Sequence, residues 1–381
     1  MKQIKQYLDE LMEKSTPDKP VWNMEAILEN KPAHWSYVDG AMGMAILNMY
    51  EATGEEKYIE FLDNFIDYYI EEDGSILGYE LIVYNSDSIN EGKLLFALLE
   101  KTGKEKYRLA LDKLYTQVKW QPRTNEGSFW HKLVYPYQVW LDGLYMVEPF
   151  YVQYELTFND GKNIKDIMAQ FENVEKLMKD QETGLFYHGY DESRQLFWAD
   201  KKTGLSKHFW TRSLGWYAMA LVDTIALLPE KFAAEKNSLS KQLNDLLASL
   251  LKFQDADSKL FYQVTDLGGR EGNYLETSGS CAISYTLMKA ARLEIIASEN
   301  FERGKEILEH VVSEKLSNDQ DGFALNDICL VAGLGGMNGR GTVKVRDGSF
   351  EYYISEPKVQ NDAKGVAPLI FAYSEVLKNK L

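Results

Sequence analysis

Apolar residues recur at helical spacing along almost the whole chain, and the segments they form are of two kinds. One kind is apolar on nearly every face, which is typical of a buried helix. The other kind has one apolar stripe opposite a charged face, which is typical of a helix at the surface. The buried kind covers residues 39–50, 88–100, 143–156, 212–228, 278–293 and 364–377. The surface kind covers residues 4–12, 56–70, 104–118, 163–179, 236–253 and 301–316.

The two kinds alternate, six against six, and this alternation predicts an all-α fold, the (α/α)6 barrel, in which an outer ring of helices wraps an inner ring. Short strand patterns occur in the loops before the inner helices, at 184–190 and 196–200 and in a hairpin expected from 342–345 and 350–354. These loops lie where inner helices begin, so this end of the barrel is the predicted active face. No linker or low-complexity tract divides the chain, and we expect a single domain over residues 1–381.

Charge and composition exclude several classes of function. The net charge of −16 argues against nucleic acid and anionic membranes as partners. No stretch reaches the length of a membrane span, and the first 14 residues are a charged amphipathic pattern without a signal sequence, so we expect a cytoplasmic monomer. The two cysteines are far apart, and the five histidines form no HxH or HExxH pair. We therefore expect no disulfide, no metal and no cofactor.

One carboxylate stands out within an apolar run. In the segment PYQVWLDGLYMVEPFYVQYELT, residues 136–157, Asp142 lies between apolar residues on both sides. A partly buried carboxylate is costly unless it is hydrogen-bonded or protonated. Asp142 is interpreted either as the N-cap of the following helix, which is the commoner use of such an Asp, or as a catalytic acid tuned by burial.

Polar residues open each inner helix, and most of them fit helix capping. Asp87 with Glu91, and Thr277 or Ser278, have the residue types preferred at N-caps. Arg212 does not fit, because a cation near a helix N-terminus opposes the helix dipole. It lies between Trp210 and Trp216 in an otherwise apolar segment, which indicates an anion-binding pocket with aromatic walls. Together with Asp87 and Asp142 at the same barrel mouth, this pattern favours chemistry on an anionic sugar.

Four segments carry a resemblance to a known family: PYQVWLDGLYMVEPF, YHGYDES with Trp198, HFWTRSLGWYAMALVD and LETSGSCAISYTL. With them the chain resembles the unsaturated rhamnogalacturonyl hydrolases of glycoside hydrolase family 105 and, more distantly, the unsaturated glucuronyl hydrolases. The resemblance implies the (α/α)6 barrel. It also implies hydration of the C4=C5 double bond that pectin lyases leave on the terminal uronyl sugar of an oligosaccharide. The implied partner is a small unsaturated oligosaccharide.

The resemblance also implies roles for individual residues. Asp142 takes the role of general acid and base, and we expect its apolar surroundings to favour the protonated form that this role needs. Asp87 is the second acid, which orients Asp142 or the sugar. Arg212 or Lys132 is expected to bind the uronate carboxylate. The substrate-contacting positions are Tyr37, His131, Lys132, His188 and Arg212, with Trp210 and Trp216 as stacking residues.

Two other classes of function remain open on the sequence. The first is another (α/α)6 carbohydrate enzyme, such as a sugar epimerase, an ordinary inverting glycosidase or an unsaturated glucuronyl hydrolase. The second is a non-catalytic carbohydrate-binding scaffold. An epimerase would work through paired histidines, and a scaffold would have no need for the acids Asp87 and Asp142.

Overall fold

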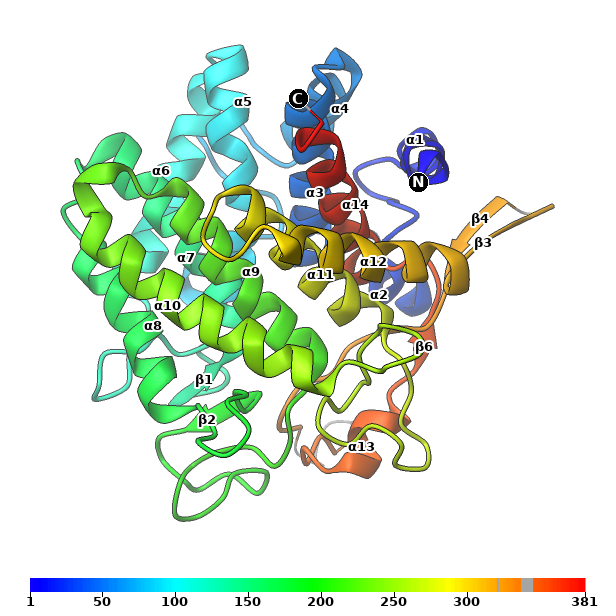
Figure 1. Cartoon of the computed structure of the whole chain (residues 1–381). Coiled ribbons are helices and arrows are strands. Elements are labelled where there is room, and N and C mark those ends of the chain that lie inside the picture. Colours follow the sequence, from blue (N-terminus) through cyan, green and yellow to red (C-terminus); the bar gives the residue numbers. More distant parts are fainter. Residues whose placement is uncertain (321, 337–344, 381) are drawn as a thin grey trace.

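Six inner helices close into a ring. The computed structural model describes residues 1–320, 322–336 and 345–380, and its inner ring is built from the six segments predicted to be buried. Each member packs against the next, and the last packs against the first. In ring order the members are α3 (Tyr37–Thr53), η2 (Ser86–Lys93) with α5 (Leu94–Thr102), α7 (Leu141–Phe158), α9 (Thr211–Leu227), α11 (Thr277–Arg292) and α14 (Ala363–Lys378). The prediction of an (α/α)6 barrel is confirmed (Figure 1).

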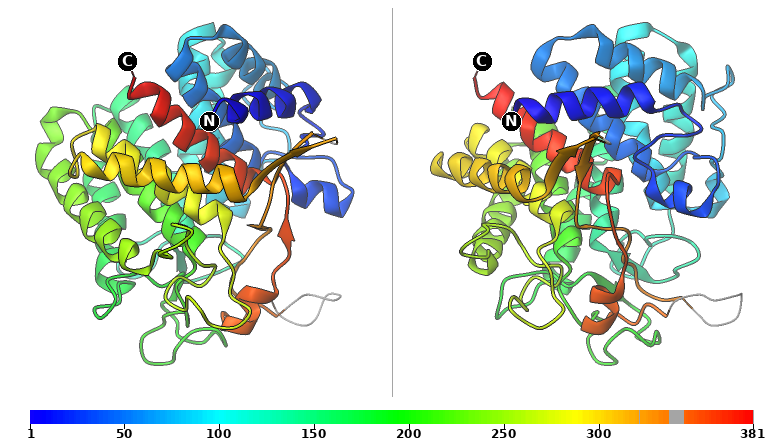
Figure 2. Two further views of the ribbon diagram at one scale, coloured as in Figure 1. Left: turned by 45° about the vertical axis from the view of Figure 1, so that its right-hand side comes forward. Right: turned by 90° about the vertical axis from the view of Figure 1, so that its right-hand side faces the viewer.

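An outer helix covers each inner member, and each buries an apolar stripe against the ring. The pairs in contact are α3 with α4 (Glu56–Asp67), α5 with α6 (Glu105–Trp120), α7 with α8 (Ile164–Leu177), α9 with α10 (Ala233–Leu250), α11 with α12 (Glu299–Glu314) and α14 with α1 (Lys2–Lys14). The first helix of the chain, α1, therefore packs against the last, α14, and completes the outer ring, as the two side views show (Figure 2).

The second inner helix differs from its prediction. A regular helix was expected over 88–100, but the chain forms a 3-10 stretch over Ser86–Lys93 before α5 begins. The stretch is crowded by α3, because a Cβ on Gly40 would lie only 2.7 Å from the Cα of Glu91. The expected capping pair is also wrong: Asn85 accepts from the Asp87 amide at 3.1 Å, and Glu91 instead accepts from the Ser36 amide at 2.8 Å.

The strands are short and pair across the loops. Three two-stranded antiparallel sheets occur in the described residues: β1 (Gln138–Trp140) with β2 (Gly189–Asp191), β3 (Leu316–Asp319) with β4 (Gly322–Leu325), and β5 (Ile328–Cys329) with β6 (Lys358–Val359). The predicted hairpin around Asp347 is wrong, because residues 350–354 lie in α13 (Phe350–Ser355), whose N-terminus is capped by Ser349 at 3.1 Å from the Tyr352 amide. Residues 342–344 of its other arm lie outside the described residues.

The remaining elements are short connectors: α2 (Met24–Glu29), η1 (Leu81–Val83), η3 (Glu230–Phe232) and η4 (Leu251–Phe253). Of these, α2 matters for the site, because it lies beside the start of the inner ring. In the described residues, no helix combines the length and the apolar character needed to cross a membrane.

Candidate active site

The predicted site residues gather at the end of the barrel where the inner helices begin. The longest loops, the β1–β2 sheet and α13 lie at this end, at the bottom of Figure 1. Helix α7 starts directly after β1, and this places Asp142 in its first turn. Helix α9 starts at Thr211, which places Arg212 in the first turn of that helix. The ring geometry thus turns positions far apart in sequence toward one mouth.

Asp142 does not cap its helix. The N-cap residue is Trp140, and no side chain caps the helix. The Oδ2 atom of Asp142 is buried and has no hydrogen-bond partner in the described part of the chain. It lies 3.3 Å from Nε2 of His188, within ion-pair distance but not aligned for a hydrogen bond, and the Asp142 side chain is 15% exposed. The capping interpretation is therefore wrong, and the carboxylate faces an imidazole at the edge of solvent.

His188 is held from its other side. Its ring is completely buried, and Nδ1 lies 2.8 Å from the hydroxyl of Tyr353 in α13. The His188 carbonyl also accepts from the Leu141 amide at 3.1 Å, which ties its loop to the start of α7. The ring of Trp210 lies 4.8 Å away, between centroids. These contacts fix the position of the imidazole ring that faces Asp142. The ring can be displaced only if buried polar contacts are broken, which costs free energy.

Asp87 lies in a different electrostatic setting. Its Oδ2 atom is 2.6 Å from Nζ of Lys132, and its Oδ1 atom is 3.4 Å from Nε2 of His131. Burial acts to raise the pKa of Asp87, but the charge of Lys132, with His131, outweighs it and holds the pKa below its usual value. Burial acts to lower the pKa of Lys132, and the Asp87 carboxylate more than offsets this and raises it. Asp87 and Lys132 are therefore an ion pair at neutral pH.

His131 is neutral beside this pair. Burial lowers its pKa to about 4, although the Asp87 carboxylate acts in the opposite direction. Its Nδ1 atom lies 3.1 Å from the hydroxyl of Ser86. Its ring stacks on Trp140, with 4.6 Å between centroids and 18° between planes, and the Trp140 ring lies 5.7 Å from His188. Trp140 thus joins the Asp87 half of the site to the Asp142 half.

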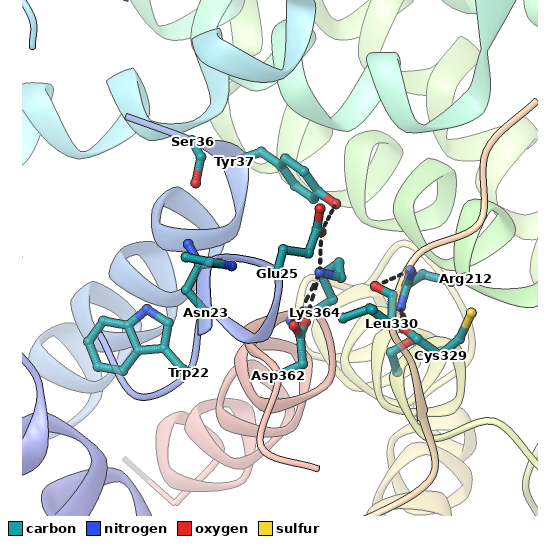
Figure 3. Close-up of polar contacts among 12 residues, drawn as sticks. Trp22, Asn23, Glu25, Ser36, Tyr37, Arg212, Cys329, Leu330, Asp362 and Lys364 are labelled. Carbon is teal, nitrogen blue, oxygen red and sulfur yellow. Dashed lines mark hydrogen bonds and ion pairs between the residues drawn. The ribbon is translucent and has the colours of Figure 1, made fainter. Parts of the chain in front are cut away.

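Arg212 is a buried cation without a carboxylate partner among the described residues. It is 2% exposed, and its guanidinium lies 4.6 Å from the ring of Trp210, one of the two tryptophans expected to form the wall of its pocket. It donates to the carbonyls of Cys329 and Leu330, as Figure 3 shows. Its Nε atom is buried and has no hydrogen-bond partner within the part of the chain that the structure describes. Arg212 therefore has a structural role that the sequence did not show, and among the described residues its charge forms no direct ion pair.

The two remaining predicted residues, Trp216 and Tyr37, have their described contacts with other parts of the site than Asp142. Trp216 is buried, and its described ring contact is a stack on Tyr145 of α7, with 4.7 Å between centroids. Tyr37 is half-buried at the start of α3 and lines a cavity together with Asp87 and Lys132. Tyr37 therefore lies on the Asp87 side of the site, and Trp216 lies within the inner ring.

Three residues of the site were missed from the sequence. Tyr353 lies in a segment interpreted as a strand, and its contact with His188 spans 165 residues. Ser86 and Trp140 lie just before the predicted inner helices 88–100 and 143–156. Only the folded chain shows that Ser86 contacts His131 and that Trp140 contacts both His131 and His188. Their signal was the clustering of aromatic and polar residues just before inner helices.

The two carboxylates of the site differ in their polar contacts. Asp87 is ionised and paired with Lys132, whereas Asp142 has a buried oxygen to which no described residue donates a hydrogen bond. Such a difference in environment is what separates an acid from a charge-stabilising group in carbohydrate enzymes. Within the described residues, no three His, Cys, Asp or Glu side chains are placed to hold a metal ion.

A barrel of helix pairs with two acids and aromatic rings at one mouth defines a carbohydrate-active enzyme. Comparison with known proteins gives its family: a model described as Glycosyl Hydrolase Family 88 matches residues 4–380, and the chain belongs to that family. It is a glycoside hydrolase. The resemblance to family 105 is also confirmed, since a solved family 105 glycoside hydrolase from C. acetobutylicum ATCC 824 is 46% identical, with a TM-score of 0.87, and the match covers 98% of this chain and 99% of that one.

Two relatives are similar over shorter stretches. Protein Atu3128 of Agrobacterium fabrum is 40% identical over 234 residues, which is 60% of this chain and 97% of that protein. The unsaturated rhamnogalacturonyl hydrolase YesR of Bacillus subtilis is 28% identical over 265 residues, which is 68% of this chain and 72% of that protein.

Proposed function

We propose that this enzyme removes the unsaturated uronyl sugar from the non-reducing end of an oligosaccharide by hydrating its C4=C5 double bond. One observation carries the proposal: the Oδ2 atom of Asp142 is buried, accepts no hydrogen bond from the described residues and faces His188 at 3.3 Å. Water addition to a vinyl ether needs an acid that protonates carbon, and a carboxyl group without hydrogen-bond donors to its charged form suits that task.

In the proposed reaction, Asp142 acts first as the acid and then as the base. Asp142 donates its proton to C4, and the electron pair of the double bond forms the new C–H bond while positive charge develops at C5 and the ring oxygen. Water then adds at C5 and gives its proton to the Asp142 carboxylate, which restores the acid. The hemiketal formed at C5 opens and releases a keto sugar and the shortened saccharide.

The other residues bind and orient the sugar. Asp87, ionised beside Lys132, stabilises positive charge that develops during protonation and accepts hydroxyl hydrogen bonds. Arg212 takes the uronate carboxylate, because its charge has no carboxylate partner among the described residues. His131, His188 and Trp210 position the ring, with Trp210 as its stacking surface. Tyr37 acts from the cavity beside Asp87, and Trp216 acts indirectly, by supporting Tyr145 within the inner ring.

We further propose an unsaturated rhamnogalacturonyl disaccharide from pectin lyase action as the substrate. The name of the relative YesR supports this choice, at 28% identity. We also propose one catalytic domain over residues 1–381, acting as a cytoplasmic monomer. In its support, the inner ring draws on both ends of the described chain, from Tyr37 in α3 to Lys378 in α14.

The test uses the ultraviolet absorbance of the conjugated enol-ether acid. Hydration removes this chromophore, so incubation with unsaturated galacturonyl-rhamnose should abolish the signal. Unsaturated glucuronyl disaccharides in the same assay distinguish the glucuronyl hydrolase alternative. A steady signal on every unsaturated disaccharide would exclude the proposed reaction and leave an epimerase, an ordinary glycosidase or a binding scaffold.

A further inference from the structure

A cavity of about 230 Å³ adjoins Asp87 on the side formed by α2 and the start of α3. Its walls include Glu25, Tyr37, Asp87 and Lys132. Pockets for drug-sized ligands have volumes of about 300–1,000 Å³, so this cavity suits a single sugar ring. Asp87 belongs both to the proposed site and to the wall of this cavity, so on the proposed placement of the unsaturated ring at Asp142 the cavity is the adjoining space for the next sugar.

Each lysine of the cavity is already paired with a carboxylate. Lys132 pairs with Asp87 at 2.6 Å, and at the exposed rim Lys31 pairs with Glu29 at 2.7 Å. Behind the wall, Lys364 is 1% exposed at the start of α14 and pairs with Glu25 at 2.6 Å. An anionic group that entered the cavity would have to break one of these pairs or remain unpaired, and an unpaired buried charge is costly.

Glu25 is held in one orientation, as Figure 3 shows. Its Oε1 atom accepts from Nζ of Lys364 at 2.6 Å and lies 3.5 Å from the hydroxyl of Tyr37. Its Oε2 atom has no protein hydrogen bond among the described residues. Burial acts to raise the pKa of Glu25, but Lys364, with smaller effects of Arg212 and Lys132, lowers it below its usual value. Glu25 is therefore an ionised, oriented acceptor in the cavity wall.

We propose that Glu25 determines specificity for the second sugar: its carboxylate accepts a hydroxyl hydrogen bond from a neutral sugar and repels one that carries sulfate or carboxylate. The inference rests on the proposed function and adds the chemical class of the second sugar. A carboxylate that accepts from a hydroxyl forms a charge-assisted bond. The same charge opposes an anionic substituent, so one side chain supplies both the attraction and the exclusion.

The experiment compares two unsaturated uronyl-hexosamine disaccharides that differ by a single 6-sulfate on the second sugar. For the native enzyme, kcat/KM should be at least about tenfold higher on the unsulfated member, the ratio expected for about 1.4 kcal/mol. Glu25→Gln should reduce this ratio at least about threefold, because the repelling charge is lost. Lys364 keeps Asp362 at 3.1 Å, so this variant retains a partner for its buried cation. Glu302→Gln, which removes an exposed carboxylate paired with Lys305 on α12, is the matched control and should leave the ratio unchanged.

Calorimetric binding of both disaccharides to Asp142→Asn provides a readout that does not depend on turnover. The inference is supported if the unsulfated disaccharide binds more tightly than the sulfated one and if adding Glu25→Gln reduces this difference. This result would support the inference even if the native enzyme proves inactive and the proposed function fails. Equal binding of the two disaccharides, or a ratio that Glu25→Gln leaves unchanged, overturns the inference even if the double bond is hydrated as proposed.

Discussion

Nε2 of His188 lies 3.3 Å from Oδ2 of Asp142, while Nδ1 of the same ring lies 2.8 Å from the hydroxyl of Tyr353. The imidazole thus connects the proposed catalytic acid to α13, a helix that follows it by more than 200 residues along the chain. Because Asp142 Oδ2 has no hydrogen-bond partner in the described residues, the position of this ring controls the surroundings of the acid.

Tyr353→Phe tests this relationship as a positioning effect. The ring packing is kept, but Nδ1 of His188 loses its partner, and a lost hydrogen bond costs about 0.5–1.5 kcal/mol. We expect kcat to fall by about two- to tenfold, with little change in KM and a shifted pH profile of kcat. A variant that lowers Tm but keeps kcat and its pH profile would show that Tyr353 has only a structural role.

Asp142→Asn tests the acid itself. The amide has nearly the same shape but cannot deliver a proton to carbon, and general acid catalysis contributes about 10²–10⁴ in rate. We expect a loss of this size in kcat, with disaccharide binding and Tm close to those of the native enzyme. The structure already excludes a capping role, so a variant that keeps high turnover would assign the proton transfer to another residue.

Lys132 and Arg212 are the two candidate cations for binding the uronate carboxylate. They differ in their protein partners, so substitutions at the two positions should have different effects. Lys132 is paired with Asp87 at 2.6 Å, whereas Arg212 has only carbonyl and hydroxyl acceptors among the described residues. We expect Arg212→Lys to raise KM more than about tenfold, since a hydrogen bond to a charged group contributes about 1.5–3 kcal/mol. Lys keeps the charge but not the fork geometry.

Lys132→Met should act differently, through Asp87. Without Lys132, burial raises the pKa of Asp87, so the acidic limb of the kcat/KM profile should move to higher pH. If Lys132→Met raises KM strongly without moving that limb, and Arg212→Lys has little effect on KM, the uronate binds Lys132 instead. Thermal unfolding of both variants controls for the structural contacts of Arg212.

Lys93, beneath the site, gives a prediction about stability and pH. Its Nζ atom donates to Asn90 at 2.7 Å and to the Tyr145 carbonyl at 2.5 Å, and burial lowers its pKa to about 7. The unfolded chain keeps a Lys pKa near about 10.4, so between about pH 10 and 7 the unfolded state binds more protons. The free energy of unfolding of the native enzyme should therefore fall, relative to Lys93→Met, as the pH decreases through this window.

The size of this effect has an upper limit of about 5 kcal/mol, from 1.36 kcal/mol for each pKa unit. Urea unfolding of both proteins at about pH 7 and pH 9.5 measures it. A difference in unfolding free energy that does not change between these pH values would mean that Lys93 titrates normally in the folded protein.

Much of the barrel was predictable because its inner helices are buried on every side, which leaves apolar residues on all faces of 212–228 and 278–293. The helix starts then placed Asp87, Asp142 and Arg212 at one mouth. The sequence could not show contacts that only the closed ring creates. Glu25 and Lys364 meet across 339 residues, and Arg212 meets the Cys329 carbonyl across 117.

Prediction from the local sequence pattern was also wrong where a short segment is compatible with both a strand and a helix. Residues 350–354 alternate in a way that suits a strand, but Ser349 caps a helix that turns Tyr353 toward His188. The capping interpretation of Asp142 failed for a related reason. Trp140, not Asp142, is the N-cap residue. The Asp142 carboxylate instead faces His188, which lies 46 positions later in the sequence and is brought close by the pairing of β1 with β2.

The central claim is that Asp142 protonates C4 of the unsaturated sugar, and turnover in D₂O tests it most directly. The acid exchanges with solvent, so NMR of the first turnovers should show one deuterium at C4 of the released keto sugar, together with loss of the ultraviolet absorbance. Early product without deuterium at C4, or with its absorbance retained, would contradict the account, because direct displacement at the anomeric carbon leaves the double bond intact.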